Sequence, residues 1–365
     1  MSAAPTSSTV VKRARLTAQG LLVVPGQKPT PGSVVRNLGL VQAQDLRQAL
    51  WALGARAPGS TASQVRAAFD AGTIVRTWAA RGTLMLVSPE LVDDVLTITA
   101  PRMQTQAATG FRDAGIGPEV VASLGPAVRE RCTGGATRGE LLEAIRAAGQ
   151  DTSGQRGYHP LMALSLARTI VQGPMDDSGG VRQLFVPYRE WIGGTGHDDG
   201  DRQAVLERLA LGYYAGHGPA TDADFAWWLG LPLTPARGAL ARLEQDGHMA
   251  SRRLGTTTYW MSPETAVDLD GGGQPPGARS VLALPGFDEF LLGYRDRSAS
   301  LAPEHASRVV PGGNGGFRRT IVRAGAIVGT WDPPETTEYF GPAPGAAGER
   351  ALAARLLRYR DFWAR

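Results

Sequence analysis

The sequence predicts a mainly α-helical chain with short β-hairpins, an α+β protein built from tandem winged helix-turn-helix domains. Two observations lead to this prediction: a threonine-capped helix start occurs three times, and a β-rich segment follows each start. At 365 residues with 42% hydrophobic content, the chain is long enough for two or three domains with buried cores.

Each helix start has a threonine that can cap the helix and, three residues later, a side chain that can reach back to it. The pairs are Thr61 with Gln64, Thr137 with Glu140, and Thr221 with Asp224. The β-rich pieces begin at Thr83, Gln183 and Thr256. In the third copy, residues 235–249 between the two read as an amphipathic helix with Leu240 and Leu243 on one face. The order of capped helix, second helix and strand pair predicts a winged helix.

Polar, Gly-rich segments at residues 113–118, 193–200 and 270–277 suggest domain boundaries. We therefore expect a first winged helix at 10–115 that carries the Gln42–Ala43–Gln44 motif, a second at 116–196 and a third at 197–270. A C-terminal β-hairpin region with a closing helix should occupy 271–365.

The last region reads as a strand at Val309–Val310, a Gly loop, a strand, a tight turn at Ala324–Gly325 and a further strand. Residues 349–365 read as an amphipathic helix. Its expected inward face consists of Leu352, Leu356, Leu357 and Phe362.

Composition limits the possible classes of function. No apolar run approaches the roughly 20 residues of a membrane span, and the N-terminus lacks a signal-peptide hydrophobic region, so we expect a cytoplasmic protein. A single cysteine, Cys132, excludes an internal disulfide and a cysteine-based zinc site. Lys occurs only at positions 12 and 28, so Arg supplies 36 of the 38 basic residues. Arg suits phosphate and guanine edges, although a GC-rich genome gives the same bias.

Two amides stand among the apolar residues of the segment LVQAQDLRQALWALGAR, which begins at Leu40. Gly39 can end the preceding helix, and Asp45 can cap the next one, which leaves Leu40 to Gln44 extended. Residues two apart in extended backbone project to one side, so Gln42 and Gln44 should point into one space, with Val41 and Ala43 packed behind them. The residues alone leave open whether these amides act on a ligand or satisfy backbone groups at a helix junction.

Several segments together resemble the winged-helix DNA glycosylases of the AlkZ and YcaQ type. They are LVQAQDLRQALWALGAR, TWAARGTLMLVSPE, GPATDADFAWWLGL with RGALARLEQDG, LPGFDEFLLGYRDRS, and VVPGGNGGFRRTIV followed by GAIVGTW. The resemblance runs from roughly Leu16 to Trp331. It implies three tandem winged helices in a C-shaped arrangement and removal of alkylated guanine from double-stranded DNA. Gln42–Ala43–Gln44 resembles the Gln-x-Gln branch, which is associated with antibiotic self-resistance, whereas the YcaQ-like branch has Asp at the second position.

The resemblance implies that Gln42 and Gln44 are catalytic. They would position the attacking water and stabilise the cationic sugar, whereas Asp45, as a helix cap, should point elsewhere. The expected substrate is N7-alkylguanine carrying a bulky natural-product adduct or an interstrand cross-link, and the product is an abasic site. No metal and no cofactor are expected, and the protein should act as a cytoplasmic, nucleoid-associated monomer.

DNA binding needs further contacts, for which the sequence offers candidates. Near the amides or the late hairpins lie the candidate phosphate-binding residues Arg36, Arg47, Arg76, Arg81, Arg318, Arg319 and Arg323. Each can equally be an ordinary surface charge. Phe317 beside the GGNGG turn can wedge into a minor groove or belong to the core.

Other chemistries find little support. The five histidines, His159, His197, His217, His248 and His305, form no close pair, and His197–Asp199 with Asp201 reads as a turn rather than a metal site. GGNGG lacks the lysine and helix of a phosphate loop. The rival interpretations are a non-catalytic winged-helix regulator and an adduct-sequestering protein. A regulator usually binds as a dimer with one recognition helix per subunit, which fits three copies in one chain less well.

Overall fold

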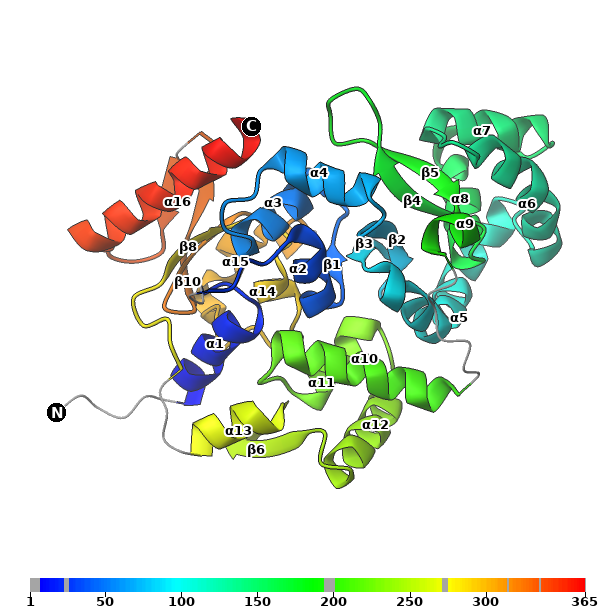
Figure 1. Ribbon diagram of the computed structural model, residues 1–365. Helices are drawn as coiled ribbons and strands as arrows, with labels where there is room; N and C mark the ends of the chain where they lie inside the picture. Colours follow the sequence, from blue (N-terminus) through cyan, green and yellow to red (C-terminus); the bar gives the residue numbers. More distant parts are fainter. Residues whose placement is uncertain are drawn as a thin grey trace. The chain divides into compact units, whose positions relative to one another are not determined.

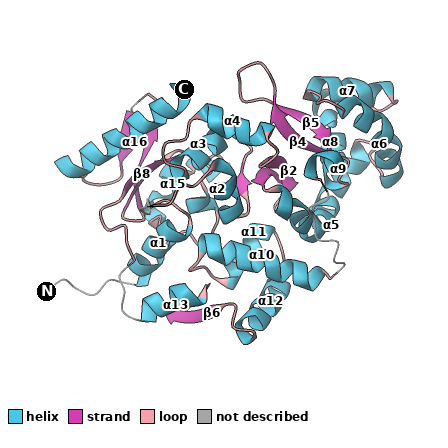
Figure 2. Ribbon diagram, viewed as in Figure 1, coloured by secondary structure: helices cyan, strands magenta, loops and turns pink. Residues whose placement is uncertain are grey.

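A computed structural model describes residues 7–22, 26–193, 201–270, 275–313, 315–334 and 336–364. Helices predominate in it and the strands are short, which confirms the expected mixed α/β composition (Figures 1 and 2). The chain divides into two compact units. Unit 1 comprises Met1–Val65 and Leu206–Arg365, and unit 2 comprises Arg66–Val205.

Unit 1 is assembled from the two ends of the chain. Its first segment contains α1 (Ser7–Ala18), α2 (Pro31–Leu38), β1 (Val41–Gln42), α3 (Leu46–Arg56) and the start of α4 (Ala62–Asp70). Its second segment contains most of α10 (Arg202–His217), then α11 (Asp222–Leu229), α12 (Leu233–Gln245), β6 (Ala250–Leu254), β7 (Thr257–Met261), α13 (Pro263–Asp270), β8 (Val281–Leu284), α14 (Glu289–Leu292), α15 (Ala306–Val309), β9 (Thr320–Arg323), β10 (Ala326–Asp332), β11 (Thr336–Tyr339) and α16 (Ala346–Ala364).

Unit 2 is continuous in the sequence. It contains β2 (Val75–Ala79), β3 (Thr83–Val87), α5 (Pro89–Asp113), α6 (Pro118–Cys132), α7 (Arg138–Ala147), α8 (Tyr158–Leu166), β4 (Ile170–Met175), β5 (Gln183–Pro187) and α9 (Tyr188–Ile192). Its strands pair antiparallel in the order β3-β2-β4-β5. Cys132 is free and buried at the end of α6, where burial raises the pKa of its thiol to about 12.

The three predicted helix caps are confirmed. In each, the threonine hydroxyl accepts a hydrogen bond from the backbone N–H three residues later, and the side chain of that residue accepts one from the threonine N–H. The pairs are Thr61 with Gln64, Thr137 with Glu140, and Thr221 with Asp224. The predicted helix at residues 235–249 corresponds to α12, with Leu240 and Leu243 buried as expected, but it ends earlier, at Gln245.

A four-stranded antiparallel sheet, ordered β11-β10-β9-β8, forms the centre of the C-terminal half of unit 1. The indole N–H groups of Trp51 and Trp331 donate to the β8 carbonyls of Ala283 and Leu284 at 3.0 and 2.9 Å. The ring of Tyr359 on α16 packs edge-on against both indoles, at 5.1 and 4.9 Å between centroids. These aromatic contacts hold α3 and α16 against the sheet.

Two predictions in this region are wrong. Val309–Val310 does not begin a strand, because Val309 ends the short helix α15 and is fully buried in the core. A two-residue apolar run has no period that separates the two states. Leu357 is 48% exposed, because the buried face of α16 passes through Leu352, Leu356, Tyr359 and Phe362. The predicted turn at Ala324–Gly325 is confirmed by positive φ angles of 49° and 81° between β9 and β10.

No helix in the described parts of the chain is both long enough and apolar enough to cross a membrane.

Candidate active site

The backbone around the two amides follows the local signals of the sequence. Gly39 ends α2 with a φ of 71°, a conformation that a residue with a Cβ rarely adopts. Asp45 caps α3, its Oδ1 accepting a hydrogen bond from the Gln48 N–H at 3.2 Å. Both predicted helix boundaries are therefore confirmed.

The two amides alternate with buried residues, as predicted. Val41 and Ala43 are fully buried, whereas Gln42 is half-buried and Gln44 is exposed. The extended stretch is shorter than expected, because the strand covers only Val41–Gln42 and the chain bends at Gln44. The segment therefore presents one partly enclosed amide and one open to solvent.

The main chain of Gln42 is held by a residue that the sequence analysis did not single out. Its N–H donates to Oε1 of Glu289 at 3.1 Å. Glu289 begins α14 and is itself 1% exposed. The segment LPGFDEFLLGY, noted only for its resemblance, thus supplies a buried carboxylate directly behind the candidate catalytic strand.

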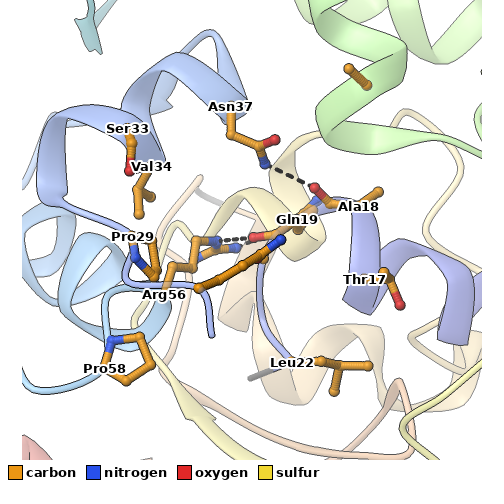
Figure 3. A pocket seen from close by; sticks show the side chains of 13 residues that line it. Thr17, Ala18, Gln19, Leu22, Pro29, Ser33, Val34, Asn37, Arg56 and Pro58 are labelled. Carbon is orange, nitrogen blue, oxygen red and sulfur yellow. Dashed lines mark hydrogen bonds between the residues drawn. The ribbon is translucent and has the colours of Figure 1, made fainter. Parts of the chain in front are cut away.

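A second buried carboxylate fixes α14 against α3. Asp288 accepts two hydrogen bonds at 2.8 Å from the guanidinium of Arg56, the last residue of α3, and also caps α14 through the Phe290 N–H. Gln19 Oε1 accepts a further hydrogen bond from Arg56 at 2.7 Å. Figure 3 shows Arg56 and Gln19 meeting beside a cavity of about 380 Å³. The network fixes the helix that carries Glu289 to the helix that follows Gln44.

Three of the candidate phosphate-binding arginines in unit 1 are exposed. Arg36 lies in the last turn of α2, and Arg323 ends β9. Arg47 lies in the first turn of α3, with its guanidinium 3.9 Å from the ring centroid of Trp363. These side chains are accessible at the surface of unit 1.

Phe317 and the next two arginines are already engaged by the protein. Phe317 is half-buried against the core and lies 5.1 Å below the guanidinium of Arg297. Arg318 pairs with Glu338 at 2.9 Å, and Arg319 pairs with Asp332 at 3.1 Å. A role for any of them in DNA binding would need these partners to be exchanged for phosphate, or Phe317 to leave its packing.

Arg76 and Arg81 belong to unit 2. Arg76 is half-buried on β2 and donates to Oε1 of Gln172 at 2.9 Å. Arg81 follows β2 in the turn to β3 and is also half-buried. Both therefore belong to the β2–β3 hairpin, Arg76 within its first strand and Arg81 at its turn.

No group of three or more His, Cys, Asp or Glu residues within the described ranges is placed to hold a metal ion. His197–Asp199, considered above as a turn or metal site, lie outside those ranges.

Comparison with known proteins decides the family. The sequence model of the family described as DNA glycosylase AlkZ-like matches residues 35–362, which include the Gln42–Ala43–Gln44 motif and most of α16. The chain belongs to the AlkZ-like DNA glycosylase family. This AlkZ-like chain is therefore an enzyme of DNA repair, and the resemblance drawn from its sequence segments is confirmed.

Two proteins of Streptomyces sahachiroi show how far the AlkZ-like similarity extends. A protein named interstrand DNA cross-link repair glycosylase is 25% identical over 337 residues, which cover 88% of this chain and 86% of the relative. The solved structure of Streptomyces sahachiroi DNA glycosylase AlkZ matches with a TM-score of 0.81 at 24% identity, covering 97% of this chain and 96% of the other. The two chains share one fold over nearly their whole length.

Proposed function

We propose that this enzyme is a monofunctional DNA glycosylase that hydrolyses the N-glycosidic bond of N7-alkylguanine, preferentially in bulky natural-product adducts or interstrand cross-links. The observation that carries the proposal is the pair Gln42 and Gln44, which alternates with fully buried residues between two capped helices. The name of the Streptomyces sahachiroi relative supports cross-links as substrates. In this account the enzyme serves antibiotic self-resistance and acts at the nucleoid.

The proposed reaction does not need a strong general acid or a strong general base. Alkylation at N7 gives guanine a positive charge, so the base leaves as a neutral molecule when the electron pair of the C1′–N9 bond moves onto N9. Oxocarbenium character then develops on the sugar. A water oxygen bonds to C1′, and its proton passes to solvent. Positioning and electrostatics can supply most of the rate.

The two amides suit a reaction whose rate depends on positioning and electrostatics. Gln42, half-buried with its main chain held by Glu289, is in a defined place. Gln44 is exposed and accessible to DNA. An amide carbonyl can accept a hydrogen bond from the attacking water while its dipole stabilises the cationic sugar. We propose this role for both residues.

The element order supports three winged helices. In unit 2, α6, α7 and α8 precede the β4–β5 hairpin, and in unit 1, α10, α11 and α12 precede β6–β7. Along the chain, α3 and α4 precede β2–β3 in the same way. We propose that these are tandem DNA-binding modules and that the enzyme acts as a monomer, because one chain then supplies the contacts for which a regulator needs two.

A comparison of two substrates tests the proposed reaction. The wild-type enzyme is incubated in excess over duplex DNA that carries one N7-guanine adduct, either methyl or a bulky aromatic group, and the products are identified by mass spectrometry. We expect free alkylguanine and an abasic strand, with faster release of the bulky base. DNA that is bound but left intact in both cases would contradict the proposal and favour a regulator or an adduct-sequestering protein.

A further inference from the structure

Glu289 has a second buried partner besides the main chain of Gln42. While Oε1 accepts the Gln42 N–H, Oε2 lies 3.5 Å from Nε2 of His217, which ends α10 and is fully buried. Glu289 therefore joins the strand that carries Gln42 to an imidazole on a helix 72 positions earlier in the sequence.

The hydrogen bonds determine where the protons of this pair lie. Nδ1 of His217 is 3.2 Å from the carbonyl oxygen of Tyr213, and because a carbonyl only accepts, Nδ1 carries a hydrogen. Neither Nε2 of His217 nor Oε2 of Glu289 has a hydrogen-bond partner among the described residues. Two lone pairs that face each other would repel, so one proton must lie between these two atoms. The pair is therefore either an imidazolium with a carboxylate or a neutral imidazole with a carboxylic acid.

The surroundings hold both side chains in place. The His217 ring stacks on Tyr213 at 4.6 Å with an interplanar angle of 9°. The Tyr294 hydroxyl donates to the His217 carbonyl at 2.9 Å, and the Gln19 side chain donates to the Glu289 carbonyl at 3.1 Å. Asp288, the carboxylate next to Glu289 in the sequence, is paired with Arg56. A Glu289 side chain held in this way presents Oε1 to Gln42 in one orientation.

Stability alone is a poor reason to bury this pair. Removing a carboxyl and an imidazole from water costs free energy, and apolar residues of similar volume often stabilise a protein as well or better. What an apolar pair lacks is an acceptor for the Gln42 N–H. That N–H belongs to the residue whose side chain the proposed reaction uses.

We propose that Glu289, oriented by His217, is a positioning residue for Gln42. It fixes the Gln42 main chain and thereby the place where the amide holds water, without touching DNA itself. The proposal rests on the proposed catalytic role of Gln42. The length of the Glu289 side chain should therefore matter for the rate of base release, whereas its charge should not.

Two conservative variants separate reach from charge. Glu289→Asp keeps the carboxylate but withdraws it by one methylene from the Gln42 N–H, so single-turnover base release should slow about 100-fold, as expected for a misplaced catalytic group. Glu289→Gln keeps the reach: its carbonyl accepts from Gln42, and its NH₂ can donate to neutral His217. Its rate should stay close to wild type. Both variants should bind an uncleavable 2′-fluoro analogue of the same adducted DNA as tightly as wild type does.

A double-mutant cycle shows whether Glu289 acts through Gln42. In the Gln42→Ala background, Glu289→Asp should slow base release no further, because the amide that it positions is absent. A merely structural role would instead lower Tm or DNA affinity and would slow release equally in both backgrounds. Hydrogen exchange of the wild-type protein adds a measurement that needs no variant: the Gln42 amide should exchange slowly.

The opposite results would overturn the proposal. These are a slow Glu289→Gln beside a fast Glu289→Asp, additive effects in the cycle, or rapid exchange of the Gln42 amide in wild type. If Gln42→Ala itself releases base at the wild-type rate, the proposed function of Gln42 fails first. If Gln42→Ala is slow but Glu289→Asp is not, only the positioning role fails.

Discussion

At the scale of single residues, the two lysines, Lys12 and Lys28, are the side-chain amines that could attack the sugar in place of water. Lys12 lies on α1, where burial lowers the pKa of its ammonium group, and a Cβ on Gly325 would lie 3.0 Å from its Cγ. A lysine that attacks C1′ forms a Schiff base that borohydride traps. We predict no trapped enzyme–DNA complex on a denaturing gel when borohydride is added during base release. A trapped complex that disappears in Lys12→Ala or in Lys28→Ala would contradict attack by water.

The contribution of each exposed arginine to DNA binding can be tested separately. If Arg323 contacts a phosphate, Arg323→Gln should reduce the slope of log affinity against log salt by about 0.9, measured with an undamaged duplex. Arg350→Gln is the matched control, because Arg350 is also exposed but lies on α16 and not on β9. Equal slopes for the two variants would remove Arg323 from the DNA interface.

Sequence could identify Gln42 and Gln44 because alternation and helix caps are local signals. It could not identify Glu289, which meets Gln42 across 247 positions, or Asp288, which meets Arg56 across 232. The two acidic residues of the segment Asp288–Phe290 follow no periodic pattern that would mark them as buried. Only the packing of α14 against α3 brings them to the site.

At the scale of elements, the ion pair between α3 and α14 should carry much of their attachment. Arg56 and Asp288 are 1% and 3% exposed, so Asp288→Ala leaves a buried guanidinium with an incomplete set of partners. We expect a loss of about 3–5 kcal/mol in the free energy of unfolding, measured by urea denaturation.

The surface pair Arg237–Asp222 provides the comparison for that measurement. Its arginine is 64% exposed, so Arg237→Ala should cost less than about 1 kcal/mol. Similar losses for the two variants would show that burial does not set the contribution of the α3–α14 pair.

Elements with local signals were predicted well from the sequence. The helix caps at Thr61, Thr137 and Thr221 involve residues three apart in the sequence, and the buried residues of α12 repeat with the helical period. The failures occurred where tertiary packing decides. Val309 is buried in a helix rather than a strand, and Leu357 lies just outside the buried face of α16.

At the scale of the whole molecule, the compact units do not follow the Gly-rich segments. Their boundaries fall inside α4 and α10, and unit 1 combines the first 65 residues with the last 160. Leu16 and Leu21, for example, share a core with Leu282 and Val322. Composition marks where a chain can turn, but not which distant segments share a core. The division into four domains stays a prediction.

The central claim is that the Gln42 and Gln44 amides carry the reaction. Its most direct test is the single-turnover rate of base release from bulky-adduct DNA for Gln42→Ala, Gln44→Ala and wild type. Gln106→Ala, which truncates an exposed amide on α5, serves as the matched control. We predict a loss of about 100-fold or more in each of the first two variants, with unchanged DNA affinity and a wild-type rate for the control. Wild-type rates in both Gln42→Ala and Gln44→Ala would contradict the account.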